Sequence, residues 1–224
     1  MSATTTPIRI PLASGQSVSG LLCTPESPSA CFVFAHGAGA GMGHAFMASL
    51  ANALAERGVA TLRFQFPFME EGSKRPDPPA VAQAAVRAAA AEAAQRLPGV
   101  PLFAGGKSFG GRMSSQAQAQ GGIDGVRGLI FVGFPLHPSG KPATSRAEHL
   151  AQVSVPMLFL QGTRDALAEL ELIEQVTSGL GDRATLVVID GADHAFHVLA
   201  RSGRTDADVI AQLADECARW LAAH

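Results

Sequence analysis

Ser108, Asp165 and His194 are the residues whose types and chain order could carry out chemistry. Ser108 lies in Gly106-Lys-Ser-Phe-Gly110, which follows a short apolar run and precedes a helix-compatible segment. A Gly-x-Ser-x-Gly turn between a strand and a helix is typical of a nucleophile elbow, because its glycines tolerate a crowded backbone that lifts the serine hydroxyl above the sheet. In a chain with 24 glycines the pattern is weak by itself, so the partners of the serine decide its meaning.

The other two residues supply what a serine nucleophile needs. A serine hydroxyl attacks poorly at neutral pH, so His194 is expected to remove its proton and later pass that proton to the leaving group. Asp165 is expected to fix the tautomer of the imidazole and to stabilise its cation. The order Ser, Asp, His along the chain is that of the α/β-hydrolases. Asp190 and Asp193 are rival acids, but a carboxylate so near the histidine in sequence rarely reaches its Nδ1 atom.

Simpler interpretations exist for the acid and the base. Asp165 precedes a helix-compatible segment and, without the other two residues, would be interpreted as a helix N-cap. His194 follows Gly191 and could belong to a capped turn. The three residues gain their meaning together, since each follows a different apolar run that is predicted to be a strand.

Acyl transfer also needs amide donors at the point where negative charge develops in the transition state. We expect one donor to be the amide of Phe109, directly after the serine. The other is expected in the glycine-rich turn His36-Gly-Ala-Gly-Ala-Gly-Met-Gly43, at Ala38 first and Gly39 next. His36 itself is expected to orient this turn.

Three other kinds of site fit the residues less well. A phosphate-binding loop ending in Gly-Lys-Ser requires a glycine where Pro101 stands. The dinucleotide fingerprint requires its third glycine where Met42 or His44 stands. His194 and His197 could be two metal ligands, but no third ligand follows at a suitable spacing. The sequence therefore predicts neither a metal nor an organic cofactor.

The elements that would position these residues alternate between apolar strands and helices. Strands are predicted over residues 8–12, 18–23, 31–35, 59–66, 100–104, 126–132, 156–160 and 184–189, and helices over 44–57, 80–97, 109–120, 167–179 and 205–223. The first two strands form an antiparallel hairpin at the edge of the sheet. This order predicts a single domain over residues 1–224 with an α/β-hydrolase fold, in which helices cover both faces of about eight mostly parallel strands.

Composition narrows the classes of function. The net charge is −2 and only 16% of the residues are charged, so no basic field for nucleic acid and no apolar run for a membrane span is expected. The first residues lack the pattern of a secretory signal, which predicts a cytoplasmic protein. Cys23, Cys31 and Cys217 are expected to be reduced and buried, although a bridge between the first two across a hairpin is conceivable.

The spacing of the motifs also predicts an open site. Residues 133–155 are too few to hold a cap domain, so the mouth is expected to be shaped by residues 66–79 and 134–145. The first of these segments contains four prolines and is predicted to be a loop. Phe68, Met69 and Leu136 are expected to form a small apolar wall against the substrate. We therefore expect short acyl chains to be preferred and no interfacial activation.

Four basic residues occur in the same two segments or directly after them, and they hint at an anionic substrate. They are Lys74, Arg75, Lys141 and Arg146. Solvated surface charge is the interpretation that the sequence favours for them.

The chain resembles the α/β-hydrolase-fold serine hydrolases, close to the small dienelactone-hydrolase-like enzymes. A narrower resemblance is to the branch named after testis-expressed protein thirty and a nonspecific-lethal complex subunit. The segments that carry it are residues 36–42, 66–72, 75–79, 105–112, 135–138 and 161–165. This resemblance implies the fold and the three site residues but no substrate, because the dienelactone hydrolases proper carry cysteine where Ser108 stands.

Together these features predict a serine hydrolase that cleaves a small ester, thioester or amide through an acyl-enzyme on Ser108. The alternative is a binding or scaffolding module that keeps the fold without turnover, as a complex subunit of the narrower branch would. The presence of nucleophile, acid, base and oxyanion turn at the ends of successive predicted strands favours catalysis. The expected partner is a small acyl substrate, without nucleic acid or membrane, and the sequence leaves the oligomeric state open.

Overall fold

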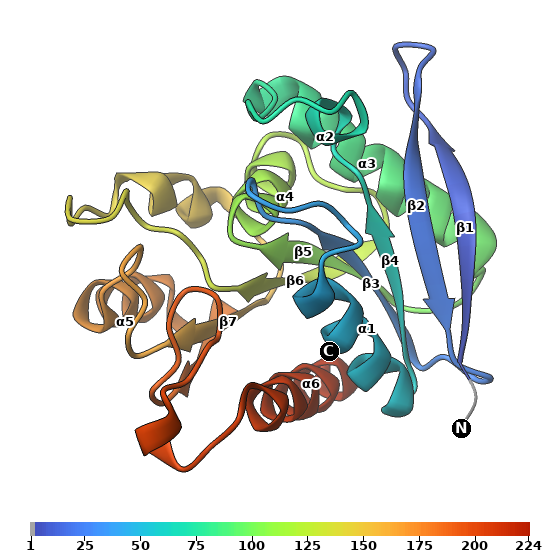
Figure 1. The fold of residues 1–224 in the computed structure, drawn as a ribbon. Coiled ribbons are helices and arrows are strands. Elements are labelled where there is room, and N and C mark those ends of the chain that lie inside the picture. The colour runs from blue at the N-terminus through green and yellow to red at the C-terminus, as the bar shows by residue number, and fades with distance from the viewer. Residues whose placement is uncertain (1–2) are drawn as a thin grey trace.

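The centre of the molecule is one sheet of eight strands. A computed structural model describes residues 3–224, so the first two residues of the predicted domain lie outside it. The strand order is β1-β2-β4-β3-β5-β6-β7-β8 (Figure 1). The strands are β1 (Thr4–Pro11), β2 (Ser17–Thr24), β3 (Ala30–Ala35), β4 (Val59–Phe64), β5 (Leu102–Lys107), β6 (Val126–Val132), β7 (Met157–Gly162) and β8 (Ala184–Ile189).

Most neighbouring strands run parallel, and the two antiparallel pairs lie at one edge. β1 pairs with β2 and β2 with β4 in antiparallel register, whereas the remaining six strands are parallel to one another. The central strands β3 and β4 are buried along their whole length, as strands covered on both faces must be. The edge strand β1 instead alternates, with Ile8 and Ile10 facing the core. The predicted α/β-hydrolase sheet and its edge hairpin are confirmed.

Helices cover both faces of the sheet. They are α1 (Ala45–Glu56), α2 (Pro67–Glu70), α3 (Pro79–Arg96), α4 (Phe109–Ala119), α5 (Leu170–Leu180) and α6 (Asp206–Ala223), with short 3₁₀ turns at Ser145–Gln152, Gly181–Arg183 and Ala200–Ser202. α1 and α6 pack together on one face, and α3, α4 and α5 contribute to the core on the other (Figure 1). None of the helices in residues 3–224 is long and apolar enough to cross a membrane.

Only a short connection joins β6 to β7. It contains the 3₁₀ segment Ser145–Gln152, whose Ala147 and Leu150 are buried against the core. The predicted absence of a cap domain is therefore confirmed.

Several element boundaries differ from the sequence prediction. The proline-rich loop predicted from residue 67 begins with the one-turn helix α2, because proline at the first helical position costs no hydrogen bond. β5 continues past residue 104 through Gly105 and Gly106, whose backbones press against neighbouring strands. α5 begins at Leu170 rather than at 167, since Asp165 and Leu167 form a turn first.

The three thiols are free and buried. A bridge between Cys23 and Cys31 does not form, because the first lies on β2 and the second on β3, and β4 separates these strands. Burial raises the pKa of Cys31 and of Cys217 to about 12. The expectation of reduced, buried thiols is confirmed, and thiols with so high a pKa are unreactive.

Candidate active site

The structure brings Ser108, His194 and Asp165 together at the carboxyl ends of the parallel strands. The Ser108 hydroxyl lies 2.9 Å from Nε2 of His194. Nδ1 of the same ring lies 2.7 Å from a carboxylate oxygen of Asp165. A proton can therefore pass from the hydroxyl to the imidazole while the carboxylate holds the ring from the other side.

Ser108 occupies a strained backbone position between β5 and α4. Its φ and ψ are 50° and −112°, which is unusual for a residue with a side chain. Glycines on either side make this turn possible. A Cβ at Gly106 would lie 2.2 Å from the Ala35 carbonyl oxygen, and one at Gly110 would lie 2.5 Å from the same atom. The elbow is thus wedged against the end of β3, and only glycine fits at these two positions.

Asp165 is the most deeply buried member of the three. Its side chain is 1% exposed. One oxygen accepts a hydrogen bond from the side-chain amide of Gln161 at 2.5 Å as well as facing His194, and the other accepts from the Leu167 amide at 2.8 Å. A buried carboxylate needs such donors. They fix the direction in which Asp165 faces the imidazole.

His194 lies in the loop that follows β8. Asp193 ties this loop to itself, because its Oδ1 accepts hydrogen bonds from the amides of Ala195 and His197 at 2.8 and 3.0 Å. The loop also packs on the end of β7, where a Cβ at Gly162 would lie 2.3 Å from the Ala192 carbonyl oxygen. Asp193 therefore shapes the turn, and its carboxylate does not contact the imidazole.

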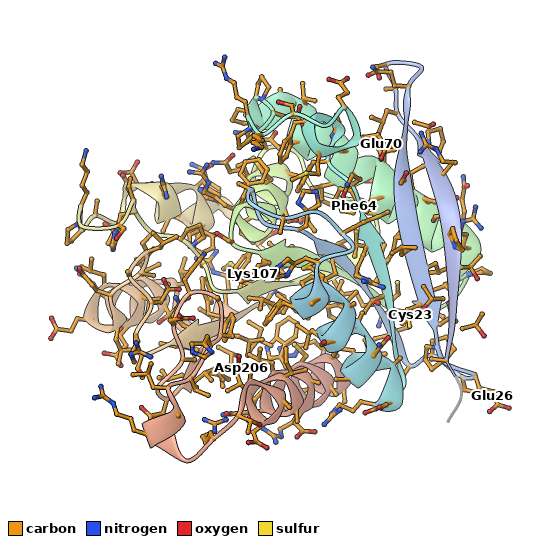
Figure 2. All side chains as sticks on the ribbon, viewed as in Figure 1. Cys23, Glu26, Phe64, Glu70, Lys107 and Asp206 are labelled. Carbon is orange, nitrogen blue, oxygen red and sulfur yellow. The ribbon has the colours of Figure 1, made fainter. Side chains whose placement is uncertain are left out.

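Lys107 also holds the histidine loop, and the sequence analysis assigned it no role. Its ammonium donates a hydrogen bond to the His194 carbonyl at 2.5 Å and lies 5.4 Å from the centre of the Phe196 ring. Figure 2 shows Lys107 near the middle of the molecule. Burial lowers the pKa of Lys107 to about 8, against the opposing charges of Asp165 and Asp193. Lys107 therefore fixes the backbone of His194.

The glycine-rich turn after β3 is oriented by His36, as expected. Nε2 of this buried ring accepts a hydrogen bond from the Phe66 amide at 3.0 Å, so Nδ1 carries the proton and donates to the Gly37 carbonyl at 2.7 Å. Burial lowers the pKa of His36, which keeps the ring neutral. The far end of the turn is held at Met42, whose amide donates to the side chain of Gln65 at 2.9 Å.

The expected oxyanion donors face the same region. Phe109 is the first residue of α4, and the first amides of a helix have no partner within it. In the described chain the amides of Phe109, Ala38 and Gly39 donate no backbone hydrogen bond. Ala38 and Gly39 line a cavity of about 390 Å³ together with Ser108 and His194. Both groups of amides are therefore available to a bound carbonyl oxygen.

Two cavities adjoin Ser108. The cavity of about 390 Å³ is mostly apolar and is lined by Phe46, Met47 and Leu167 besides the glycine-rich turn. A second cavity of about 330 Å³ lies between the proline-rich loop and α4, and Arg112 and Arg146 line it. The site thus has one apolar side and one side with two arginines.

The three residues predicted to form an apolar wall, Phe68, Met69 and Leu136, do not line the cavities beside Ser108. Leu136 is fully buried in the core. Phe68 packs against the rings of His36 and Phe109, and Met69 packs against the core. Residue 136 and the short helix α2 turn inward instead of forming an exposed rim, and Leu167 lines both cavities.

Sequence reasoning also missed the partners behind the site. Gln161 precedes Asp165 by four residues, so the turn after β7 brings their side chains together. A signal for it existed, because a polar residue at the end of an apolar strand requires a buried partner. Lys107 carried no comparable signal, since a lysine in a glycine-rich turn is ordinarily exposed.

The structure gives no support to a metal site. In residues 3–224 no cluster of three or more His, Cys, Asp or Glu side chains could hold a metal ion. His197, the possible second ligand, bonds instead to Asp206 at 2.9 Å. This contact raises the pKa of His197 and lowers that of Asp206.

The model of the alpha/beta hydrolase domain family matches residues 28–222, from before β3 to within one residue of the end of α6. The chain therefore belongs to this family. The match leaves out residues 1–27, which include the edge hairpin, and the last two residues.

Solved structures similar to the chain have the same fold. Dienelactone hydrolase from Anabaena variabilis is 19% identical, with a TM-score of 0.80 over 100% of this chain and 99% of that one. A serine hydrolase without a lid from Xanthomonas campestris is 22% identical, with a TM-score of 0.76 over 98% and 96%. The esterase domain of a Rhodothermus marinus protein is 16% identical, with a TM-score of 0.73 over 97% of each chain. At these identities the likeness concerns the fold.

Proposed function

We propose that the chain is a serine hydrolase that cleaves a small ester, thioester or amide through an acyl-enzyme on Ser108. The observation that carries this proposal is the unbroken relay of hydrogen bonds from Ser108 through His194 to Asp165, at 2.9 and 2.7 Å. Such distances are those of a nucleophile ready to lose its proton to a base.

The reaction has two halves. In the first, the Ser108 oxygen attacks the substrate carbonyl carbon while Nε2 of His194 takes the hydroxyl proton, and the carbonyl oxygen becomes an oxyanion near the amides of Phe109 and Ala38 or Gly39. The intermediate collapses, the bond to the leaving group breaks, and His194 protonates that group. In the second half His194 takes a proton from a water molecule, whose oxygen attacks the acyl carbon. The bond to Ser108 then breaks, His194 returns the proton to the serine oxygen, and the carboxylic acid is released.

The positive end of α4 supports the same mechanism. Ser108 directly precedes this helix of eleven residues, and the partial positive charge at a helix N-terminus favours an anion there. Asp165 remains bonded to Gln161 and Leu167 throughout, so it can stabilise the imidazolium without moving.

Two finer expectations belong to this proposal. The resemblance to the branch named after testis-expressed protein thirty and a nonspecific-lethal complex subunit is a proposal about ancestry, and a scaffolding module remains the alternative to catalysis. The cytoplasmic location and the absence of nucleic-acid and membrane partners also stay predictions.

A fluorophosphonate probe tests the proposal directly. We expect it to label Ser108 in the wild-type protein, with a single adduct in the intact mass, and Ser108→Ala to abolish the labelling. Ser114→Ala is the matched control, because Ser114 lies on the same helix but is buried and bonded to backbone carbonyls. No labelling of the folded wild type, or equal labelling of the Ser108→Ala protein, would favour the scaffolding alternative.

A p-nitrophenyl ester series tests the shape of the site. We expect kcat/KM to be highest for acyl chains of about two to six carbons, since an open cavity buries further methylenes only in part. A kcat/KM value that keeps rising through twelve carbons would contradict this expectation.

A further inference from the structure

The cavity of about 330 Å³ beside Ser108 has an unusual distribution of charge. Its lining includes Arg112 on α4 and Arg146 in the connection between β6 and β7, together with the nucleophile itself. Both arginine side chains are partly buried. A basic pair next to a serine nucleophile could bind an anionic part of the substrate.

Neither arginine has a partner within residues 3–224. No hydrogen bond or ion pair involves the guanidinium of Arg112 or of Arg146, and the Nε atom of Arg112 is buried without any partner. By contrast, the partly buried Arg57 pairs with Asp215 at 2.7 Å. A buried unpaired donor costs free energy unless a ligand or water satisfies it.

The surroundings leave this positive charge uncompensated. Burial and the neighbouring charge of Arg146 lower the pKa of Arg112. His149, bonded to Ser115 at 2.7 Å, is neutral, because burial and the charge of Arg112 lower its pKa to about 4.

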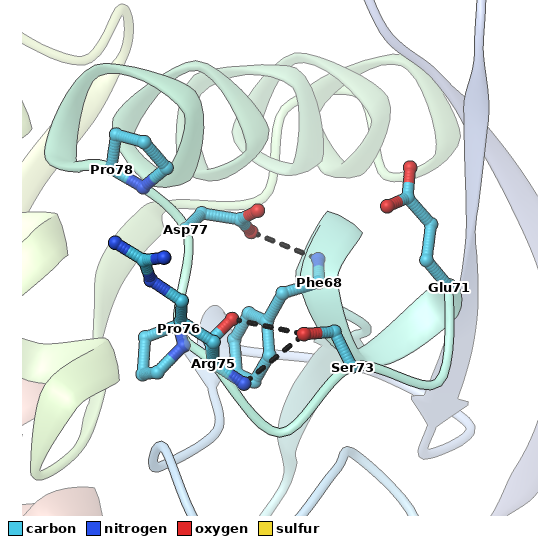
Figure 3. Close-up of a pocket in the computed structure, with 7 residues that line it drawn as sticks. All are labelled: Phe68, Glu71, Ser73, Arg75, Pro76, Asp77 and Pro78. Atoms are coloured by element: carbon cyan, nitrogen blue, oxygen red, sulfur yellow. Dashed lines mark hydrogen bonds between the residues drawn. The ribbon is translucent and has the colours of Figure 1, made fainter.

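Asp77 is the acidic residue of the cavity lining, and it is engaged elsewhere. Its carboxylate accepts a hydrogen bond from the Phe68 amide at 3.0 Å, as Figure 3 shows for the neighbouring cavity that shares Asp77 and Pro76. Among the described residues it forms no ion pair with Arg112 or Arg146. Two guanidinium groups thus face one carboxylate, and the lining is positive overall.

We propose that Arg112 and Arg146 bind a carboxylate or phosphate group of the substrate, so that the hydrolase acts on anionic esters. Guanidinium groups match the planar or tetrahedral oxygens of both anions with paired hydrogen bonds. This proposal rests on the proposed function and adds a substrate class to it. It also changes the interpretation of one of the four basic residues noted in the sequence, since Arg146 lines the site whereas Lys74, Arg75 and Lys141 are exposed.

Paired substrates test the proposal. The anion is placed on the acyl side in p-nitrophenyl hemiadipate, with p-nitrophenyl heptanoate as its neutral twin, and on the leaving group in 4-acetoxybenzoate, with 4-acetoxybenzamide as its twin. In at least one pair we expect the wild type to prefer the anion by about tenfold or more in kcat/KM, the scale of a charged hydrogen bond. Arg112→Gln and Arg146→Gln should each remove most of this preference, so that kcat/KM for the anionic ester approaches that for its neutral twin.

Arg127→Gln is the matched control, because Arg127 is exposed at the opposite end of β6. It removes the same charge and should leave the preference unchanged. A preference for neutral esters in both pairs, or one for anions that survives both arginine substitutions, would overturn the proposal. Phosphate is tested separately from carboxylate with an acetate ester whose leaving group carries a phosphate monoester. Its neutral twin is the same ester with the phosphate converted to the dimethyl triester.

A binding experiment separates this proposal from the proposed function. In Ser108→Ala, adipate and inorganic phosphate are titrated by calorimetry, and at least one should bind with an affinity that Arg112→Gln lowers by about tenfold. Binding without fluorophosphonate labelling of the wild type would leave the anion site standing and remove the hydrolase. Labelling of Ser108 without anion binding or anion preference would support the hydrolase and remove the anion site.

Discussion

The two halves of the proposed site are held in place by different means. The serine side, from Gly105 to Gly111, is fixed by backbone that presses on backbone, with glycines where a Cβ would overlap the carbonyl oxygens of β3 and β6. The histidine side, residues 190–206, packs on β7 at Gly162 and is otherwise fixed by side chains that bond to backbone, those of Lys107, Asp193 and Asp206. The backbone of Ser108 therefore depends on the packing of the sheet, whereas that of His194 depends mainly on polar contacts.

This contrast predicts that substitutions on the serine side change stability and that substitutions on the histidine side change activity in a folded protein. The experiments below test it.

Gly110→Ala should have the largest effect on stability. Its new methyl group would meet the backbone oxygen of Ala35 at 2.5 Å, and backbone cannot move aside. We expect the free energy of unfolding to fall by about 3 kcal/mol and the fluorophosphonate labelling to be lost. Gly179→Ala in α5 is the matched control, because nothing lies within 4 Å of that position, and it should stabilise the protein by up to about 1 kcal/mol. Equal melting temperatures for the two variants would contradict the contrast.

Asp165→Asn should change activity far more than stability. An amide cannot hold the imidazole in the required tautomer, so we expect kcat to fall on the order of 10⁴-fold. Asp193→Asn should cost about tenfold or less, since an amide oxygen can still accept the bonds from Ala195 and His197. Steady-state kinetics with p-nitrophenyl acetate gives the ranking, and the opposite ranking would mean that the acid is misassigned.

Lys107→Met should lower kcat/KM by about ten- to a hundredfold, because the backbone of His194 loses its clamp and the ring shifts. The same variant has a signature in stability. The folded pKa of Lys107 is about 8, below its ordinary value of 10.5, so between these values the unfolded chain binds more protons and the free energy of unfolding gains a term that rises with pH. Denaturant titrations from pH 8 to 10.5 should show this term in the wild type and not in Lys107→Met.

Ionisation of the buried thiols changes the free energy of unfolding with pH in the opposite direction, and it provides an internal reference. Cys31 and Cys217 have pKa values raised from 9.0 to about 12, so above pH 9 the folded state holds their protons and the free energy of unfolding falls as pH rises. This fall is common to both proteins. The difference between the wild type and Lys107→Met therefore isolates the lysine, and identical pH profiles would refute its pKa shift.

Asp206→Asn should have the smallest effect. The Asp206 carboxylate raises the pKa of His197 through a hydrogen bond at the exposed end of the histidine loop. The raised pKa stabilises the fold below pH 6.5, and this contribution is lost as pH rises through the folded value. We expect an NMR titration to show the pKa of His197 move down toward 6.5, with kcat/KM changed by no more than about twofold.

The sequence predicted the serine side better than the histidine side for the same physical reason. Glycine spacing is local and its purpose is backbone geometry, so Gly106, Ser108 and Gly110 could be interpreted along the chain alone. The clamp from Lys107 to His194 joins residues 87 positions apart. Nothing in the local sequence of either residue indicates this contact, because Lys107 is buried only once the loop after β8 packs over it.

The proposed substrate surfaces were the least predictable part. Strand and helix periodicity placed all eight strands and the main helices, but Phe68 and Leu136 were expected at a rim and lie inward. Apolar residues in an irregular segment carry no period that could tell core from rim. Arg112 lies two residues beyond the elbow motif and was assigned no role from the sequence, because its lack of a partner is a property of the folded chain.

Ser108 and Arg112 are one helical turn apart, and the amide of Arg112 donates to the Ser108 carbonyl at 3.1 Å. Their backbones are thus offset by a fixed rise of about 6 Å along α4. Under the proposed anion site, α4 fixes the distance from the nucleophile to the backbone of one of the two arginines, so the spacing between the scissile carbonyl and the charged group of a substrate should matter. A series of dicarboxylate half-esters should then show one optimal length rather than a plateau.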